Sequence, residues 1–164
     1  MSDALATYLH DHFAGSNFAV ELLEFLRDQY AGQRVGDAAA GMLGEIEDDR
    51  KILQGIIGRV GNGVPMMKEA SAWIGEKLSE LKLRQGAFGT FEALEALALG
   101  ILGKVALWRA LATLADSDPR LSGVDFNQLA ARAEEQHSRA EELRLQCVRT
   151  AFAKLQSDRS GLCG

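Results

Sequence analysis

Apolar side chains recur every three or four residues along most of this chain, which is the spacing of one face of an α-helix. Glycines, prolines and short polar residues divide the pattern into helical segments. These segments cover about residues 3–30, 36–60, 65–86, 90–115 and 125–156. A strand would alternate apolar and polar residues, and the sequence has no such stretch and few β-branched residues. The pattern predicts an all-α protein.

Residues that suit helix caps mark the ends of these segments. The candidate N-caps are Ser2 or Asp3, Thr90 and Asp125. The candidate stop residues are Gly32 and Gly61. No periodic pattern continues after residue 156, so we expect one helical domain over residues 1–156 and a loose tail over residues 157–164.

The segment lengths restrict how the helices connect. The first, second, fourth and fifth segments are long, and short links after the first and the fourth predict two antiparallel hairpins. The third segment, about 20 residues or roughly 30 Å as a helix, can return along the whole bundle. The second and fourth helices then run parallel. Two helical hairpins joined by one long helical crossover form the ferritin-like connection pattern of a four-helix bundle.

Charge and composition narrow the range of partners. The 164 residues carry a net charge of −5, with 18 basic residues scattered among 23 acidic ones, which argues against a nucleic-acid or anionic-membrane surface. Residues 93–115 are apolar enough to cross a bilayer, but they include Glu95, Lys104 and Arg109. Each charge costs roughly 2.5–3.5 kcal/mol near a membrane centre, so we expect a buried bundle helix and a cytoplasmic protein.

Three stretches carry a resemblance to a known family: YLHDHFAGS, EIEDDR and LEALALGILGKVALWRAL. Through them the chain, over about residues 3–155, resembles the ferritin-like superfamily, in particular a small-bundle branch of bacterial proteins. The resemblance implies the fold described above. It also implies a place for a di-iron site, which in that superfamily takes a carboxylate from each of two helices and a Glu-x-x-His pair from each of the other two.

The residues that such a site requires are only partly present. Glu134 and His137 form one Glu-x-x-His pair, whereas Glu45 is followed by Asp48 where the second pair needs histidine. Folding the fifth helix back on the fourth places Glu95 level with residues 141–145. Glu134 and His137 then lie roughly 12–15 Å from Glu95, too far for metals about 3.5–4 Å apart. We therefore expect a degenerate site without a cofactor, and no catalytic residue.

Iron or manganese binding remains the alternative. Its candidate ligands are Glu45, Asp48, Glu95, Glu134 and His137.

Several polar residues interrupt the apolar faces that should point inward. They are His12, Ser16, Asp49, Lys104, His137 and Arg144. A buried carboxylate needs a cationic partner, and we expect Asp49 to pair with Arg144, with Lys104 and Glu95 as further members. One interpretation is an ionic layer that sets the helix register. The other is a polar cavity that binds a small ligand.

Two further patterns concern helix contacts. Phe18, Leu22 and Phe25 give the first helix a second apolar face, which predicts a homodimer. The glycine pairs Gly41–Gly44 and Gly100–Gly103 suggest close approach of the two parallel helices. The leading functional hypothesis is a non-catalytic scaffold or interaction protein without metal. The alternatives are a metal-binding oxidoreductase or storage protein, and a small-ligand binder.

Overall fold

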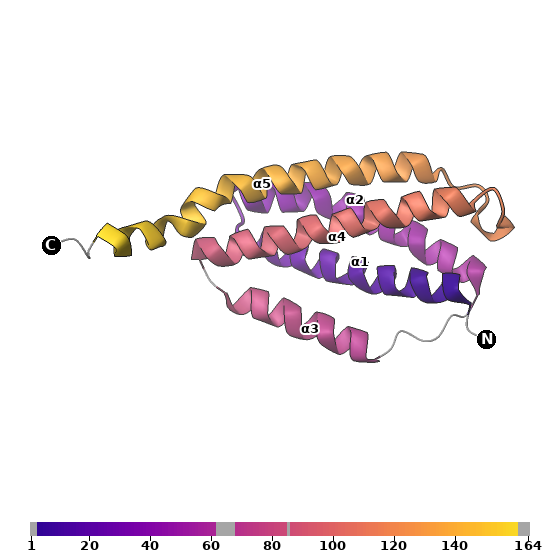
Figure 1. Ribbon diagram of the computed structural model, residues 1–164, viewed down its shortest axis with the longest axis horizontal. Helices are drawn as coiled ribbons and strands as arrows, with labels where there is room; N and C mark the ends of the chain where they lie inside the picture. The colour runs from indigo at the N-terminus through magenta and orange to yellow at the C-terminus, as the bar shows by residue number, and fades with distance from the viewer. Residues whose placement is uncertain (1–2, 62–67, 85, 161–164) are drawn as a thin grey trace.

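The computed structural model describes residues 3–61, 68–84 and 86–160, and within these ranges all regular secondary structure is helical. The helices are α1 (Ala4–Gln29), α2 (Arg34–Val60), α3 (Lys68–Leu83), α4 (Gly86–Leu114), the short 3₁₀ helix η1 (Pro119–Leu121) and α5 (Phe126–Ser160) (Figure 1). The predicted all-α class is confirmed. The expected start of the third helix near Pro65 lies outside the described residues.

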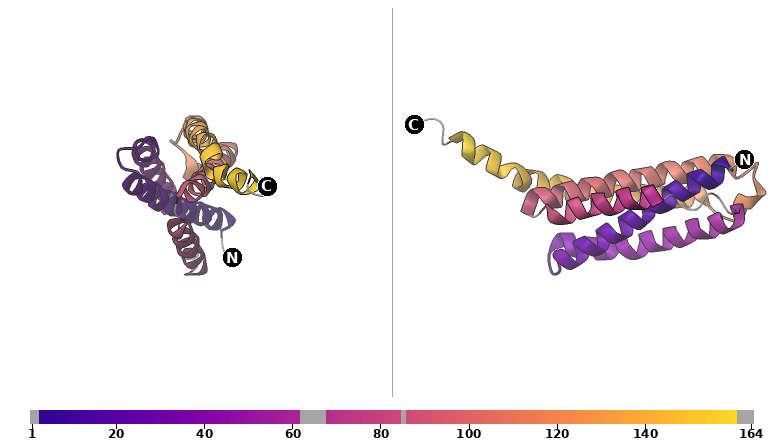
Figure 2. Two further views of the ribbon diagram at one scale, coloured as in Figure 1. Left: turned by 90° about the vertical axis from the view of Figure 1, so that its left-hand side faces the viewer. Right: turned by 90° about the horizontal axis from the view of Figure 1, so that it is seen from below.

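The helices pack as two extensive pairs, α1 with α2 and α4 with α5. Contacts of α1 with α4, and fewer contacts of α2 with α5, join the two pairs. Successive helices run in opposite directions, so α2 and α4 point the same way (Figure 1). The helix α3 lies on the outside of the bundle, against α1 and α4 (Figure 2).

Most of the helix ends follow the predicted caps. The Asp3 carboxylate accepts a hydrogen bond from the Leu5 amide at 3.0 Å, and the Asp125 carboxylate accepts one from the Gln128 amide at 3.0 Å. Gly32 and Gly61 follow α1 and α2 with φ of 76° and 99°, values that favour glycine.

The start of α4 differs from the expectation. Thr90 lies inside α4 and does not cap it, because Gly86, with φ of 85°, makes the left-handed turn four residues earlier. Thr90 instead donates to the Gly86 carbonyl at 3.1 Å and shares a 2.5 Å hydrogen bond with the Tyr30 hydroxyl. It therefore ties the end of α1 to α4. At the other end of the chain, α5 continues to Ser160, beyond the expected end at residue 156.

The interior consists of two apolar clusters, one toward each end of the bundle. The Leu22 cluster includes Leu22, Leu23, Leu26, Ile46, Leu97 and Ile101. The Trp108 cluster includes Leu9, Leu53, Ile56, Val105, Trp108, Leu111 and Leu121. Asp49 and Lys104 each lie in sequence between members of the two clusters, so polar residues separate the apolar ends of the bundle.

The second apolar face of α1 is covered by the chain itself. Leu22 is fully buried, and Phe18 and Phe25 pack against the Leu22 cluster. Leu78 and Leu81 of α3 belong to the same cluster. The face that we expected to form a homodimer interface is therefore an internal contact with α3.

The expected close approach at the glycine pairs is also wrong. A Cβ atom at Gly41, Gly44, Gly100 or Gly103 would meet open space. Close approach occurs instead where the chain turns into a helix: a Cβ atom at Gly36 would overlap the Tyr30 carbonyl. The turn between α1 and α2 thus requires the absence of a side chain at Gly36.

Two glycine-to-alanine substitutions on α2 are expected to have opposite effects. Gly36→Ala should lower the free energy of unfolding by about 1–3 kcal/mol, because the turn must open to admit the methyl group. Gly41→Ala should raise it by about 0.5–1 kcal/mol, because alanine loses less backbone entropy in an exposed helix. Urea denaturation followed by circular dichroism measures both, and equal effects of the two would contradict the α1–α2 turn.

Candidate functional site

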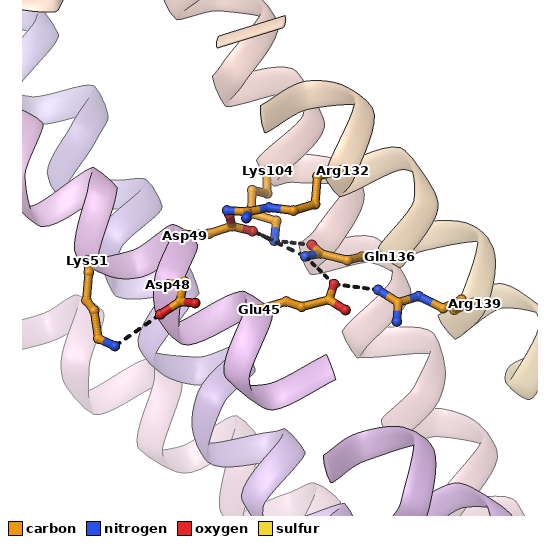
Figure 3. A network of polar contacts seen from close by, with 8 residues as sticks. All are labelled: Glu45, Asp48, Asp49, Lys51, Lys104, Arg132, Gln136 and Arg139. Atoms are coloured by element: carbon orange, nitrogen blue, oxygen red, sulfur yellow. Dashed lines mark hydrogen bonds and ion pairs between the residues drawn. The ribbon is translucent and has the colours of Figure 1, made fainter. Parts of the chain in front are cut away.

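The buried charged centre of the bundle is Asp49 of α2, which is only 1% exposed. Lys104 of α4 places its Nζ atom 2.5 Å from Oδ2 of Asp49, and Arg132 of α5 donates to Oδ1 (Figure 3). A carboxylate removed from water is costly unless cations and hydrogen bonds replace the solvent. Here each oxygen of Asp49 has a cationic partner.

Gln136 of α5 connects this carboxylate to a second one. Its side chain is fully buried, and its Nε2 donates to Glu45 at 3.0 Å and lies 3.4 Å from Asp49. Its Oε1 accepts a hydrogen bond from Lys104. Arg139, one turn further along α5, forms an ion pair with Glu45 (Figure 3). We call these six residues the polar network: Glu45, Asp49, Lys104, Arg132, Gln136 and Arg139.

The polar network fills the seam between α2 and α5. Close contacts between these two helices are few compared with those inside the α1–α2 and α4–α5 pairs. Arg132, Gln136 and Arg139 span the remaining distance because each carries a long side chain with several donors. The bundle is therefore joined along this seam by hydrogen bonds and ion pairs more than by apolar packing.

The polar network carries an excess positive charge, since the cations Lys104, Arg132 and Arg139 face the carboxylates Glu45 and Asp49. Burial lowers the pKa of Lys104, and the attraction of Asp49 opposes this effect. The hydrogen bond from Arg139 is the main reason that the pKa of Glu45 is lowered. An additional negative group near Lys104 would find a favourable potential.

A cavity of about 60 Å³ adjoins the polar network between α1, α2 and α4. Its polar wall includes His12, Ser16, Asp49 and Lys104, and most of the remaining wall is apolar. Such a volume holds about four water molecules or a compact organic ligand. Burial lowers the pKa of His12, which favours the uncharged imidazole.

Two wall residues of the cavity have donors that the described contacts do not use. The Lys104 ammonium has three N–H groups, and its contacts with Asp49 and Gln136 account for two. The indole Nε1 of Trp108 is buried and has no hydrogen-bond partner among the described residues. The Nε1 atom of Trp108 has no accessible surface, so of these two donors only the Lys104 ammonium can serve a ligand in the cavity.

The expected pair of Asp49 with Arg144 is wrong. Arg144 forms ion pairs with Glu141 at 2.7 Å and with Glu95 at 3.1 Å. The predicted register of the fourth and fifth helices is confirmed by the Glu95–Arg144 contact. The prediction failed because it placed α2 at the wrong position along the bundle axis relative to α5. Asp49 is level with Arg132, twelve residues or about 18 Å along α5 from Arg144.

The other residues expected in a buried polar layer are only partly buried. Ser16 donates to the Phe13 carbonyl at 2.6 Å within its own helix, and His12 packs edge-on against Tyr8. His137 lies on α5 near Glu141, whose pKa is lowered chiefly by Arg144 and to a smaller degree by this histidine. Of the expected layer, the structure brings together only Asp49 and Lys104 in the polar network, with His12 and Ser16 beside them at the cavity.

The candidate metal ligands are distributed over separate ion pairs. Each of the four carboxylates has a cationic partner: Glu45 with Arg139, Asp48 with Lys51, Glu95 with Arg144, and Glu134 with Arg109. No group of three or more His, Cys, Asp or Glu side chains suited to a metal ion occurs in the described part of the chain. The arrangement brings these candidates to cations and not to one another.

Three members of the polar network were not anticipated from the sequence: Arg132, Gln136 and Arg139. Their spacing of four and three residues places them on one face of α5. Glu45 and Asp49, four residues apart, form the matching acidic face of α2. The match between the donor-rich face of α5 and the acidic face of α2 is the sequence signal that could have identified the contact between these two helices.

Removing Asp49 should destabilise the protein more than removing Arg144. We expect Asp49→Leu to lower the free energy of unfolding by about 3–5 kcal/mol, because Lys104 is then buried without its carboxylate. The double variant Asp49→Leu/Lys104→Met should lose less than the sum of the single variants, with a coupling of about 1–3 kcal/mol. Arg144→Ala serves as the control and should cost less than about 1 kcal/mol. Additive losses in urea denaturation would contradict the buried pair.

The lowered pKa of Lys104 predicts a pH dependence. Between that lowered pKa and its ordinary value of 10.5, the unfolded chain binds more protons at this residue than the folded protein does. The free energy of unfolding therefore rises with pH through this window. Lys104→Met lacks the titrating group, so the stability of the wild type relative to this variant should increase as pH rises. A difference that stays constant in urea denaturation would argue against a desolvated ammonium.

The polar network and the cavity beside it form a continuous polar region inside an otherwise apolar bundle. Their members come from α1, α2, α4 and α5, so this region exists only when both helix pairs have assembled. Comparison of the chain with family models, with curated proteins and with solved structures found no match. The function is therefore inferred from the residues of this region.

Proposed function

We propose that the chain is a non-catalytic, metal-free bundle of the ferritin-like type, and that it binds a small ligand with a carboxylate in the cavity beside Lys104. The pairing of α1 with α2 and of α4 with α5 supports the ferritin-like arrangement. So does the way that α3 connects two helices pointing in the same direction (Figure 1).

Charge balance supports a bundle without metal. In the ferritin-like pattern, carboxylates from the four long helices surround metal ions, which neutralise them. Here Lys104, Arg132 and Arg139 supply that neutralising charge to Asp49 and Glu45. A metal ion entering this region would have to displace at least one of these cations. The polar network thus takes the electrostatic role that a metal centre would have.

The state of Asp49 supports a role without catalysis. A general base needs an oxygen that can accept a proton from a substrate. The Asp49 oxygens already accept hydrogen bonds from Lys104 and Arg132, and Gln136 lies near one of them. These contacts engage both oxygens of Asp49 with donors from the protein's own side chains. The chemistry that remains available is binding.

The observation that carries the ligand proposal is the Lys104 ammonium in the cavity wall. It has an N–H group that the described contacts leave unused, and the polar network around it has an excess positive charge. The apolar wall, which includes Ile46, Leu53 and Ile101, suits a short hydrocarbon body. A compact monocarboxylate meets both requirements, because its charged end binds Lys104 and its apolar end leaves water.

Calorimetric titration with butanoate tests this proposal, with butanamide as the uncharged probe of the same shape. Butanoate should bind at least about tenfold more tightly, since a hydrogen bond between two charged groups contributes about 1.5–3 kcal/mol. Lys104→Met should abolish this preference. Gly100→Leu, which adds bulk at the cavity wall, should weaken binding, whereas Gly41→Leu at another exposed helical glycine should not.

Two results would contradict the proposal. One is the absence of butanoate binding to the wild type at about 10 mM, roughly ten times the dissociation constant of a weak, millimolar ligand. The other is stoichiometric iron or manganese that survives dialysis and is lost in Glu45→Ala. That result would favour the metal-binding alternative. Metal analysis of protein purified from supplemented medium decides between them.

A further inference from the structure

The outward face of α4 is apolar, although the bundle leaves it uncovered. Leu99 is 64% exposed and Leu102 is 49% exposed, and Gly103 and Ala106 beside them are small. Among the described helices α4 is the one that is long and apolar enough to cross a membrane by length and composition, yet only 39% of its most apolar window is buried. Burial in the bundle therefore accounts for part of its apolar surface and not for this face.

The exposed positions follow the spacing of a helix–helix seam. Glu95, Leu99, Leu102, Ala106 and Arg109 are separated alternately by four and three residues. This is the heptad spacing that keeps one stripe of a helix facing a partner helix. We call these five residues the α4 stripe. Its centre is apolar, its N-terminal end is acidic and its C-terminal end is basic.

We propose that the α4 stripe binds the α4 stripe of a second copy of the chain, antiparallel and about a two-fold axis near Leu102. Glu95 and Arg109 each lie seven residues from Leu102, about 10.5 Å along the helix. The axis therefore places Glu95 level with Arg109 of the second copy, and the reverse pair forms on the other side. A parallel arrangement would instead place like charges together.

Side-chain size gives the same orientation. In the antiparallel arrangement the large Leu99 lies within one residue of the level of the small Ala106 of the second copy, and Leu102 meets its own counterpart at the axis. Leucine thus faces alanine on both sides of a central leucine pair, and the helices can approach closely. An isologous contact of this kind closes after two copies, so the proposed assembly is a dimer and not a fibre.

The present partners of the two charged ends do not prevent this contact. Glu95 pairs with Arg144 at 3.1 Å and Arg109 pairs with Glu134 at 2.7 Å, and the side chains of Glu95, Arg109 and Glu134 are exposed while that of Arg144 is partly buried. Exposed pairs of this type contribute about 0–1 kcal/mol, so they can rearrange at small cost. In the dimer the Glu95–Arg144 pair of one copy would meet the Arg109–Glu134 pair of the other copy, with Glu95 next to Arg109.

A lipid bilayer is a less suitable occupant. Insertion of α4 would bring Glu95 and Arg109 into the membrane together with Lys104, which would have to leave Asp49. It would also separate α4 from the Leu22 and Trp108 clusters. A second copy needs none of these changes, because the stripe is already at the surface.

Light scattering coupled to size-exclusion chromatography tests the proposal on the full chain. We expect a mass of twice the 17.8 kDa of one chain at about 100 μM, with dissociation on dilution toward about 1 μM. Leu102→Glu should give the monomer, since it places two carboxylates across the axis. The control is Leu83→Glu on α3, where the leucine is 79% exposed, and it should leave the mass unchanged. Circular dichroism checks that each variant is folded.

Charge reversal tests the orientation. Glu95→Arg and Arg109→Glu should each raise the dimer dissociation constant at least about tenfold, because like charges then meet twice per interface. The double variant should restore the dimer. An equimolar mixture of the two single variants should form a heterodimer, in which every charged pair is again complementary.

Three results would overturn the proposal. The first is a wild-type monomer at the highest concentration, and the second is a dimer that persists in Leu102→Glu. The third is a dimer in which neither single reversal matters and the mixture has no effect, since a different surface would then hold it. Flotation of a wild-type monomer with phosphatidylcholine vesicles, lost in Leu102→Glu, would assign the stripe to a membrane instead.

Discussion

The burial of one carboxylate, Asp49, is the constraint on which the arrangement of the helices depends. A charge this far from water is tolerated only when cations reach it, and the two that do come from α4 and α5. Its position on α2 thereby sets the height of α2 against both helices of the other pair. An apolar residue there would leave α2 free to slide, because apolar packing is much less directional than an ion pair.

The helices and most of their ends could be predicted from the sequence, because the forces that form them are local. Asp3 and Asp125 cap helices through amides two or three residues away, and Gly32 adopts a conformation that few other residues tolerate. That Glu95 and Arg144 lie at the same position along the bundle axis followed from the short connection between α4 and α5. Thr90 shows the limit of this reasoning, since its environment is set by Tyr30, sixty residues earlier.

The candidate site could be predicted only in part. The inward direction of Asp49 and Lys104 followed from helical phase, but the partner from α5 did not. That partner depends on the height of one helix pair relative to the other. The chain between them passes through α3, and its length alone allows offsets of several turns. The choice of Arg132 over Arg144 is therefore made by packing between segments distant in sequence.

The separation of the two apolar clusters also bears on how the bundle opens. The Leu22 cluster draws on the second half of α1, the first half of α4 and the middle of α5, whereas the Trp108 cluster draws on the first half of α1, the second half of α4 and the start of α5. Each of the four long helices is thus anchored twice, on either side of the buried polar residues Asp49 and Gln136. Fluctuations that fray one end of the bundle can stop at this boundary, so we expect backbone amides on its two sides to exchange as separate cooperative units.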